Sequence, residues 1–167
     1  MNLWLLGMMG SGKTEAGRRV GELLDMPFVD LDREVERRVG RTIAEVWEQE
    51  GEASFRRLES EELRRLAAAE GQVIATGGGV VLDPDNVAWI RASGRVFWLD
   101  APAEVLAARV GEGGSRPLLA GSEPAARLSA ILAERRPLYR HAAHHRVAAD
   151  RDPDQVAARI EALWNGS

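Results

Sequence analysis

A chain of 167 residues, of which 45% are hydrophobic and 29% charged, has the size and balance of one folded domain spanning residues 1–167. Its net charge of −4 argues against general binding to nucleic acid or to an anionic membrane, and the absence of cysteine excludes disulfides and thiol nucleophiles. No apolar run approaches the roughly 20 residues of a membrane-spanning helix, and we see no export signal, so we expect a cytoplasmic protein.

Apolar runs and helical periodicities alternate along the chain. In chain order they predict strand 3–6, helix 12–25, strand 28–29, helices 33–51 and 52–70, strand 73–75, helix 84–93, strand 96–99, helix 102–110, helix 123–136 ending at Pro137, strand 145–148 and helix 153–164. Strands separated by helices are typical of an α/β fold, here a three-layer α/β/α domain with a five-stranded parallel sheet.

The segment from Gly7 to Thr14 matches the phosphate-loop pattern G-x-x-x-x-G-K-[ST] between a predicted strand and a predicted helix. Its glycines permit turns that point backbone N–H groups at phosphate oxygens, and the helix start adds positive partial charge. Lys13 can reach the β- and γ-phosphates of a nucleoside triphosphate, and the Thr14 hydroxyl can bind Mg²⁺. A glycine-rich turn without a ligand is the alternative, but it does not explain why Lys13 is the one lysine among 22 basic residues.

Two acidic residues follow the second predicted strand. Alternation in an extended segment predicts that the Asp30 and Asp32 carboxylates face one side, at the carboxyl end of the sheet where such folds bind ligands. One carboxylate can face the magnesium shell, and the other can accept a hydrogen bond from an acceptor hydroxyl. The alternative is that Asp32 only caps the helix that follows.

Arginines on two predicted helices are candidates for binding an anionic substrate. Arg56 lies beside Phe55 and about 100° around the helix from Arg57, so it can face a cleft, whereas we expect Arg57 to pair with Glu61 at the surface. Arg135 lies at the end of its predicted helix. It can clamp a carboxylate there, or it can simply complement the helix dipole.

Two further segments are rich in glycine. Gly77, Gly78 and Gly79 follow the third strand, and three glycines in a row favour close approach of a ligand to the backbone over a simple turn. Residues 111–121 carry several glycines around Arg116, which predicts a mobile lid whose closure delivers Arg116 and excludes water. A long surface loop is the alternative for this second segment.

Six blocks of sequence occur in a restrictive order, and together they resemble the shikimate kinase family. The blocks are the phosphate loop, Asp30-Leu31-Asp32, Phe55-Arg56-x-x-Glu59, Gly77-Gly78-Gly79, Arg116-Pro117-Leu118-Leu119 and Arg135-x-Pro137-Leu138-Tyr139. The resemblance runs from Leu3 to the last helix. It implies a P-loop NTPase-type kinase with a small substrate-binding helical region at about 32–60, which transfers the γ-phosphate of ATP to the 3-hydroxyl of shikimate, with Mg²⁺, in aromatic amino-acid biosynthesis.

The resemblance also implies a role for each matched residue. At the nucleotide end the residues are Gly10, Ser11, Gly12, Lys13, Thr14 and Glu15, with Arg109 and Arg151 beside the adenine and Arg116 swinging in to the phosphates. Thr14 and Asp30 hold the metal. At the acceptor end Asp32 aligns or deprotonates the hydroxyl, and the remaining contacts come from Arg56 and Arg135 on the carboxylate, the backbone of Gly77, Gly78 and Gly79, and the walls Trp47 and Phe55.

Two positions depart from the family's usual pattern. Glu15 stands where Thr or Ser is usual and puts a carboxylate at the helix start, and Trp47 is larger than the expected Phe. Two other functions remain open, namely a kinase of another small hydroxy acid, such as gluconate or a shikimate analogue, and a nucleotide-binding regulator without an acceptor. No apolar stripe extends beyond what a core needs, so we expect a monomer.

Overall fold

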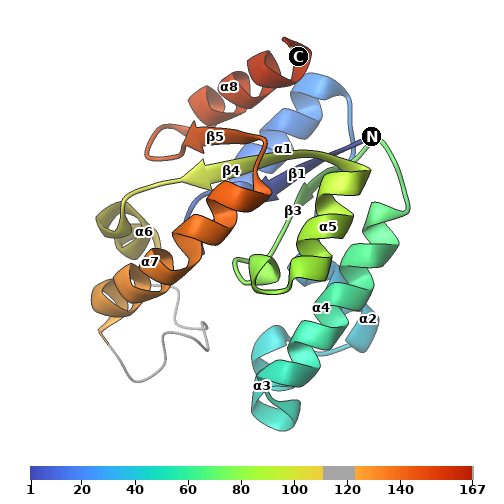
Figure 1. The fold of residues 1–167 in the computed structure, drawn as a ribbon, viewed down its shortest axis with the longest axis vertical. Helices are drawn as coiled ribbons and strands as arrows, with labels where there is room; N and C mark the ends of the chain where they lie inside the picture. The colour runs from blue at the N-terminus through green and yellow to red at the C-terminus, as the bar shows by residue number, and fades with distance from the viewer. Residues whose placement is uncertain (111–122, 167) are drawn as a thin grey trace.

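In the computed structural model, which describes residues 1–110 and 123–166, five parallel strands form one sheet in the order β2-β3-β1-β4-β5 (Figure 1). The central strand, β1 (Asn2–Leu6), is buried along its whole length, as its apolar run requires. The other strands are β2 (Phe28–Asp30), β3 (Val73–Ala75), β4 (Gly94–Asp100) and β5 (His145–Ala148). The described part of the chain therefore confirms the predicted parallel sheet, with β2 and β4 slightly longer than expected.

Helices cover both faces of this sheet. The helices are α1 (Lys13–Leu24), α2 (Leu31–Val39), α3 (Ile43–Glu50), α4 (Glu52–Ala67), the 3₁₀ turn η1 (Val80–Leu82), α5 (Pro84–Ser93), α6 (Ala103–Val110), α7 (Pro124–Ala142) and α8 (Pro153–Asn165). Helices α1 and α8 pack together on one face, and α5 and α7 lie on the other (Figure 1). The three-layer α/β/α architecture is thus confirmed.

The segment expected to be one helix at 33–51 is two helices, so that prediction is wrong. Helix α2 ends at Gly40, which has a left-handed φ of 70°, and α3 restarts behind a capping box formed by Thr42 and Glu45. The apolar positions keep helical spacing across the break, which is why periodicity alone missed it. Helices α2, α3 and α4 pack on one another at one end of the sheet (Figure 1).

The prediction that a helix ends at Pro137 is also wrong, because α7 continues through this residue to Ala142. A proline inside a helix removes one backbone hydrogen bond and crowds the preceding turn. Here Tyr139 and Ala142 are completely buried. Their burial offsets the cost of the proline and keeps the last turns of α7 helical.

Several other expectations concern the remaining parts of the chain. The expected lid at 111–121, with Arg116, lies outside the described residues. In the described part of the chain no helix is both long and apolar enough to cross a bilayer. Two histidines near β5 serve packing: His144 accepts the Val96 N–H at 3.0 Å and His145 stacks on Phe97.

Helix α1 packs tightly against the chain that leads into β2, and this contact gives a test of the fold. A Cβ added at Gly21 would lie 2.7 Å from the Met26 carbonyl oxygen, a backbone atom that cannot easily move. We expect Gly21→Ala to lower the free energy of unfolding by about 1–3 kcal/mol, although alanine is the better helix former by roughly 1 kcal/mol.

Urea unfolding followed by tryptophan fluorescence measures this difference. The control is Glu22→Ala, at an exposed position of the same helix, which we expect to change the free energy of unfolding by less than about 0.5 kcal/mol. A more stable Gly21→Ala variant would show that helix propensity outweighs the close contact.

Candidate active site

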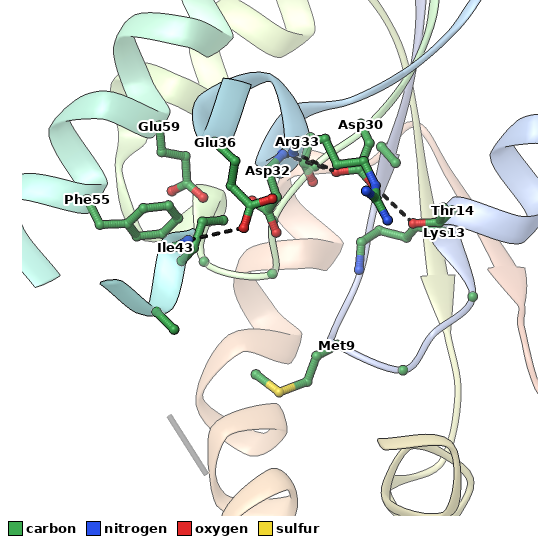
Figure 2. Close-up of a pocket in the computed structure, with 18 of the residues that line it drawn as sticks. Met9, Lys13, Thr14, Asp30, Asp32, Arg33, Glu36, Ile43, Phe55 and Glu59 are labelled. Carbon is green, nitrogen blue, oxygen red and sulfur yellow. Dashed lines mark hydrogen bonds between the residues drawn. The ribbon is translucent and has the colours of Figure 1, made fainter. Parts of the chain in front are cut away.

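A cavity of about 830 Å³ opens at the carboxyl edge of the sheet, between the phosphate loop and the α2–α4 helices (Figure 2). Fifteen of the residues proposed from the sequence line it: Gly10, Gly12, Lys13, Thr14, Glu15, Asp30, Asp32, Trp47, Phe55, Arg56, Gly77, Gly78, Gly79, Arg109 and Arg135. Segments that are far apart in the described chain therefore line the same cavity.

Three of the proposed residues do not line this cavity in the described structure. Ser11 is buried within the phosphate loop, where its N–H donates to the Met8 carbonyl at 3.1 Å. Arg151 is exposed in the connection between β5 and α8 and is not part of the cavity wall. Arg116 belongs to the segment that the structure does not describe.

The phosphate loop has the backbone that its glycines predict. Gly10 and Gly12 have φ values of 80° and 82°, in the left-handed region that favours glycine. The Lys13 ammonium donates to the carbonyls of Gly7 and Met8, at 2.7 and 2.9 Å, and so lies inside the loop. The loop therefore places a single compact cation beside the N-terminus of α1.

Two further charged residues border the phosphate loop. Arg109 from α6 donates to the Gly10 carbonyl at 3.2 Å, which places a guanidinium beside the phosphate loop. Glu15 lines the cavity but is well exposed, and Arg18 lies 3.8 Å from its carboxylate. The carboxylate that departs from the family's pattern is therefore partly neutralised by the next turn of α1.

Asp30 joins the phosphate loop to α2. One carboxylate oxygen accepts the Thr14 hydroxyl at 3.0 Å, and the other accepts the N–H groups of Asp32 and Arg33 (Figure 2). Asp30 is thus the cap of α2, and the alternative that gave this role to Asp32 is wrong. Leu31 already begins the helix, so no extended alternation aligns the two carboxylates, yet both line the same cavity.

Two of the three consecutive glycines make room for a charged side chain. A Cβ on Gly77 would lie 2.6 Å from a Glu59 carboxylate oxygen, and one on Gly79 would overlap the Arg56 guanidinium. A Cβ on Gly78 would meet the Arg135 guanidinium only at ordinary contact distance. Gly77 and Gly79 therefore let a glutamate and an arginine close against the backbone.

Glu59 is the functional candidate to which no role was assigned from the sequence. Its side chain is fully buried on α4, where it accepts a hydrogen bond from Arg56 at 2.8 Å, and its second oxygen has no hydrogen-bond partner among the residues that the structure describes. Burial raises the pKa of the Glu59 carboxyl to about 7, a rise that Arg56 opposes and the Asp32 carboxylate increases. The i, i+3 spacing from Arg56 is the sequence signal that could have identified it.

Arg135, which lines the cavity as Arg56 does, lies on α7. Arg135 is 5% exposed, and Tyr139, one turn further along, donates its hydroxyl to the Gly78 carbonyl. Burial raises the pKa of Tyr139 to about 12, so this hydroxyl keeps its proton and remains a donor. Tyr139 therefore fixes the glycine segment against the helix that carries Arg135.

Aromatic residues close the far wall of the cavity. The rings of Trp47 and Phe55 lie 6.0 Å apart between centroids, and the Arg56 guanidinium lies 5.2 Å above the Phe55 ring. This contact restricts where the guanidinium can point. The predicted pair of Arg57 with Glu61 is also present, at 3.3 Å, so Arg56 faces the cavity and Arg57 the surface, as expected.

The buried Glu59 carboxyl predicts a pH-dependent stability. Because its pKa is raised in the folded state, that state holds a proton which the unfolded chain releases as the pH rises above 4.5. Stability is therefore lost between pH 4.5 and about 7, by an amount on the order of 3 kcal/mol. We expect Glu59→Gln, which cannot ionise, to remove this loss and to be more stable than the parent protein at pH 8 but not at pH 4.5.

Urea unfolding at a series of pH values measures the two curves. Glu48→Gln changes an exposed glutamate of α3 and serves as the control for the loss of one negative charge. If the free energy of unfolding depends on pH in the same way for Glu59→Gln and the parent protein, ionisation of the buried Glu59 carboxyl does not lower stability.

Comparison with known proteins identifies the family. The family model described as "Shikimate kinase" matches residues 9–164. A curated shikimate kinase from Symbiobacterium thermophilum is 51% identical over 167 residues, covering 98% of this chain and 96% of that protein. One from Aromatoleum aromaticum is 45% identical over 158 residues, covering 94% of this chain and 90% of that protein.

Solved structures agree with the sequence matches. A shikimate kinase from Acinetobacter baumannii in complex with shikimate superposes with a TM-score of 0.96 at 37% identity, covering 99% of this chain and 93% of that one. The matches thus cover nearly the whole chain in both sequence and structure. The chain belongs to the shikimate kinase family, the ATP-dependent kinases that phosphorylate a hydroxyl of shikimate.

Proposed function

We propose that the described cavity transfers the γ-phosphate of ATP to the 3-hydroxyl of shikimate, giving shikimate 3-phosphate and ADP. One observation carries the proposal: a single cavity is lined at one end by the phosphate loop and at the other by Arg56 and Arg135 beside Asp32. A triphosphate and a small acid can therefore be held together, as direct transfer requires. The shikimate in the Acinetobacter baumannii structure supports this choice of acceptor.

At the donor end, backbone N–H groups of residues 10–14 and the start of α1 stabilise the phosphate charge. Lys13 neutralises the charge that spreads over the transferred group, because its ammonium already lies within the loop. The Thr14 hydroxyl and the Asp30 carboxylate, 3.0 Å apart, fit Mg²⁺, which takes oxygen ligands and keeps several waters. When bound with the nucleotide, Mg²⁺ supplies further neutralisation of phosphate charge.

At the acceptor end, Arg56 and Arg135 hold the shikimate carboxylate by paired hydrogen bonds. The backbone of Gly77, Gly78 and Gly79 contributes N–H groups beside them. Asp32 accepts a hydrogen bond from the 3-hydroxyl, orients it toward the γ-phosphate and takes its proton as the new bond to phosphorus forms.

The remaining assignments concern the edges of the site. We assign Arg109 and Arg151 to the adenine side, Arg116 to the phosphates in the closed state, and Trp47 and Phe55 to the wall that excludes water from the ring of shikimate. Arg109 already borders the loop through Gly10. We also propose that the enzyme acts as a monomer in the cytoplasm, with shikimate and ATP as its only partners.

Steady-state ADP release with and without shikimate tests the proposed function. We expect ADP release to depend on shikimate, with gluconate a poor substitute, and Lys13→Ala to lose nearly all turnover because one phosphate cation is removed. Lys13→Arg keeps the charge, but its wide planar head does not fit the narrow loop, so we expect a similar loss. ADP release that ignores shikimate would identify a nucleotide-binding protein without this acceptor.

Removing either arginine of the acceptor end separates the two substrates. We expect Arg56→Ala or Arg135→Ala to raise the KM for shikimate roughly 10- to 150-fold, the cost of a lost charged hydrogen bond, and to leave the KM for ATP nearly unchanged. Arg57→Ala, the next residue on α4, faces the surface and is the matched control. Equal increases in both KM values would contradict the assignment of the two arginines to the carboxylate.

A further inference from the structure

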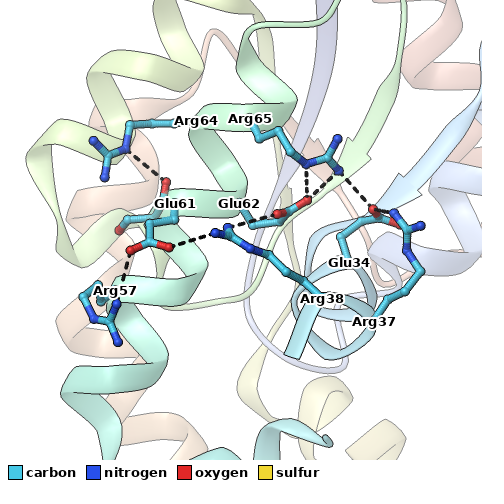
Figure 3. A network of polar contacts seen from close by, with 9 residues as sticks. Glu34, Arg37, Arg38, Arg57, Glu61, Glu62, Arg64 and Arg65 are labelled. Atoms are coloured by element: carbon cyan, nitrogen blue, oxygen red, sulfur yellow. Dashed lines mark hydrogen bonds and ion pairs between the residues drawn. The ribbon is translucent and has the colours of Figure 1, made fainter. Parts of the chain in front are cut away.

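A network of ion pairs joins α2 to α4, formed by residues that do not line the cavity, and each helix contributes a cation that reaches the other (Figure 3). From α2, Arg38 donates to Glu61 at 3.2 Å and to Glu62 at 3.5 Å, both on α4. From α4, Arg65 donates to Glu34 on α2 at 3.1 Å. The two helices are thus crossed by ion pairs in both directions.

Glu62 is the centre of this network. Its side chain is only 2% exposed, and its two oxygens are divided between the helices. One accepts from Arg65, with a nitrogen–oxygen distance of 2.6 Å to Nε, and the other accepts from Arg38. A buried carboxylate costs free energy unless it is paired, and apolar residues of similar volume often stabilise as well or better. The carboxylate is therefore better explained by the geometry it imposes than by the stability it adds.

The same two helices carry groups from both ends of the proposed acceptor site. Asp32 lies in the first turn of α2, two residues before Glu34. Glu59 lies on α4 three residues before Glu62, on the same helix face. A slide of α2 along α4 would therefore change the separation between Asp32 and the Arg56–Glu59 pair.

Most apolar contacts of α2 and α4 fix this register poorly. The buried apolar residues that the two helices contribute to the core are the aliphatic Leu31, Val35, Leu63 and Leu66, with the aromatic Phe55 near the start of α4. Contacts between aliphatic side chains are non-directional, whereas guanidinium–carboxylate pairs have fixed geometry. The ion pairs thus add directional contacts between the two helices.

We propose that Arg38, Glu62, Arg65 and Glu34 form a positioning clamp, which holds α2 and α4 in the register that lets one shikimate molecule contact Asp32 and Arg56 at once. None of the four residues lines the cavity, so each acts through the helix that carries it. This inference rests on the proposed function, because it assumes that the cavity binds shikimate between these helices.

Two matched pairs of variants test the clamp. Arg38→Met removes the two pairs that cross to Glu61 and Glu62 of α4, and Arg57→Met removes a pair with the same Glu61 that stays within α4, at nearly the same distance as Arg38–Glu61. Arg65→Met removes the third crossing pair, with Glu34, together with the Arg65–Glu62 pair. Its neighbour Arg64, which donates to the Ser60 carbonyl of the same helix, is changed to Met as its control.

We expect Arg38→Met and Arg65→Met to raise the KM for shikimate about five- to tenfold, because a small misplacement of a binding group is costly, while the KM for ATP stays within about twofold. Arg57→Met and Arg64→Met should leave both constants unchanged. Arg38→Lys, which keeps a cation on α2, should recover part of the shikimate KM. Thermal unfolding of each variant confirms that it is folded at the assay temperature.

The outcomes separate the clamp from the proposed function. If the parent protein does not phosphorylate shikimate, the proposed function fails and the clamp with it. If the parent protein is active and the crossing variants match their controls, only the clamp is overturned. An equal rise in both KM values, with a lowered melting temperature, would also overturn it, because that result describes general destabilisation.

Discussion

Parallel strands deliver the chain to one edge of the sheet, and most of the site depends on that constraint. Asp30 of β2 is level with Ala75 of β3, and Ala75 is level with Leu5 of β1. The phosphate loop begins at Gly7, two residues beyond Leu5, and Gly77 follows Ala75 at the same distance. Three segments that are remote in sequence therefore meet at one end of the sheet, where the start of α1 adds positive partial charge.

At the acceptor end of the cavity, side chains of opposite charge are buried close to one another. Glu59 is fully buried and Arg135 nearly so, and Gly77 leaves room for the Glu59 carboxylate. Burying these groups costs free energy, part of which Arg56 offsets by its hydrogen bond to Glu59. Two guanidinium groups thus line the acceptor end, and for a small acid with few apolar contacts such groups are the main source of orientation.

The parts of the site that could be predicted from the sequence are those that local chemistry determines. The phosphate loop carries its own glycines and lysine, and the strands carry their own apolar runs. Tertiary contacts decide the rest. The passage of α7 through Pro137 depends on the burial of Tyr139, and the role of Glu59 depends on a cavity that the spacing of a motif does not reveal. Gly77, Gly78 and Gly79 line the cavity, but the side chains that lie against them could not be foreseen from the sequence.

The two ends of the cavity are held by different kinds of interaction, and this difference has a consequence for specificity. The donor end is built mainly from backbone: β1, the turns at Gly10 and Gly12, and the start of α1, with the Lys13 ammonium inside the loop. The acceptor end is built mainly from side chains on α2, α4 and α7, which lie beside the backbone of the three glycines. A site formed by backbone groups tolerates many changes of side chain, whereas a charged contact changes whenever one partner changes. Substitutions can therefore alter which acid is accepted more readily than which nucleotide is bound, because more of the acceptor end depends on the identity of individual side chains.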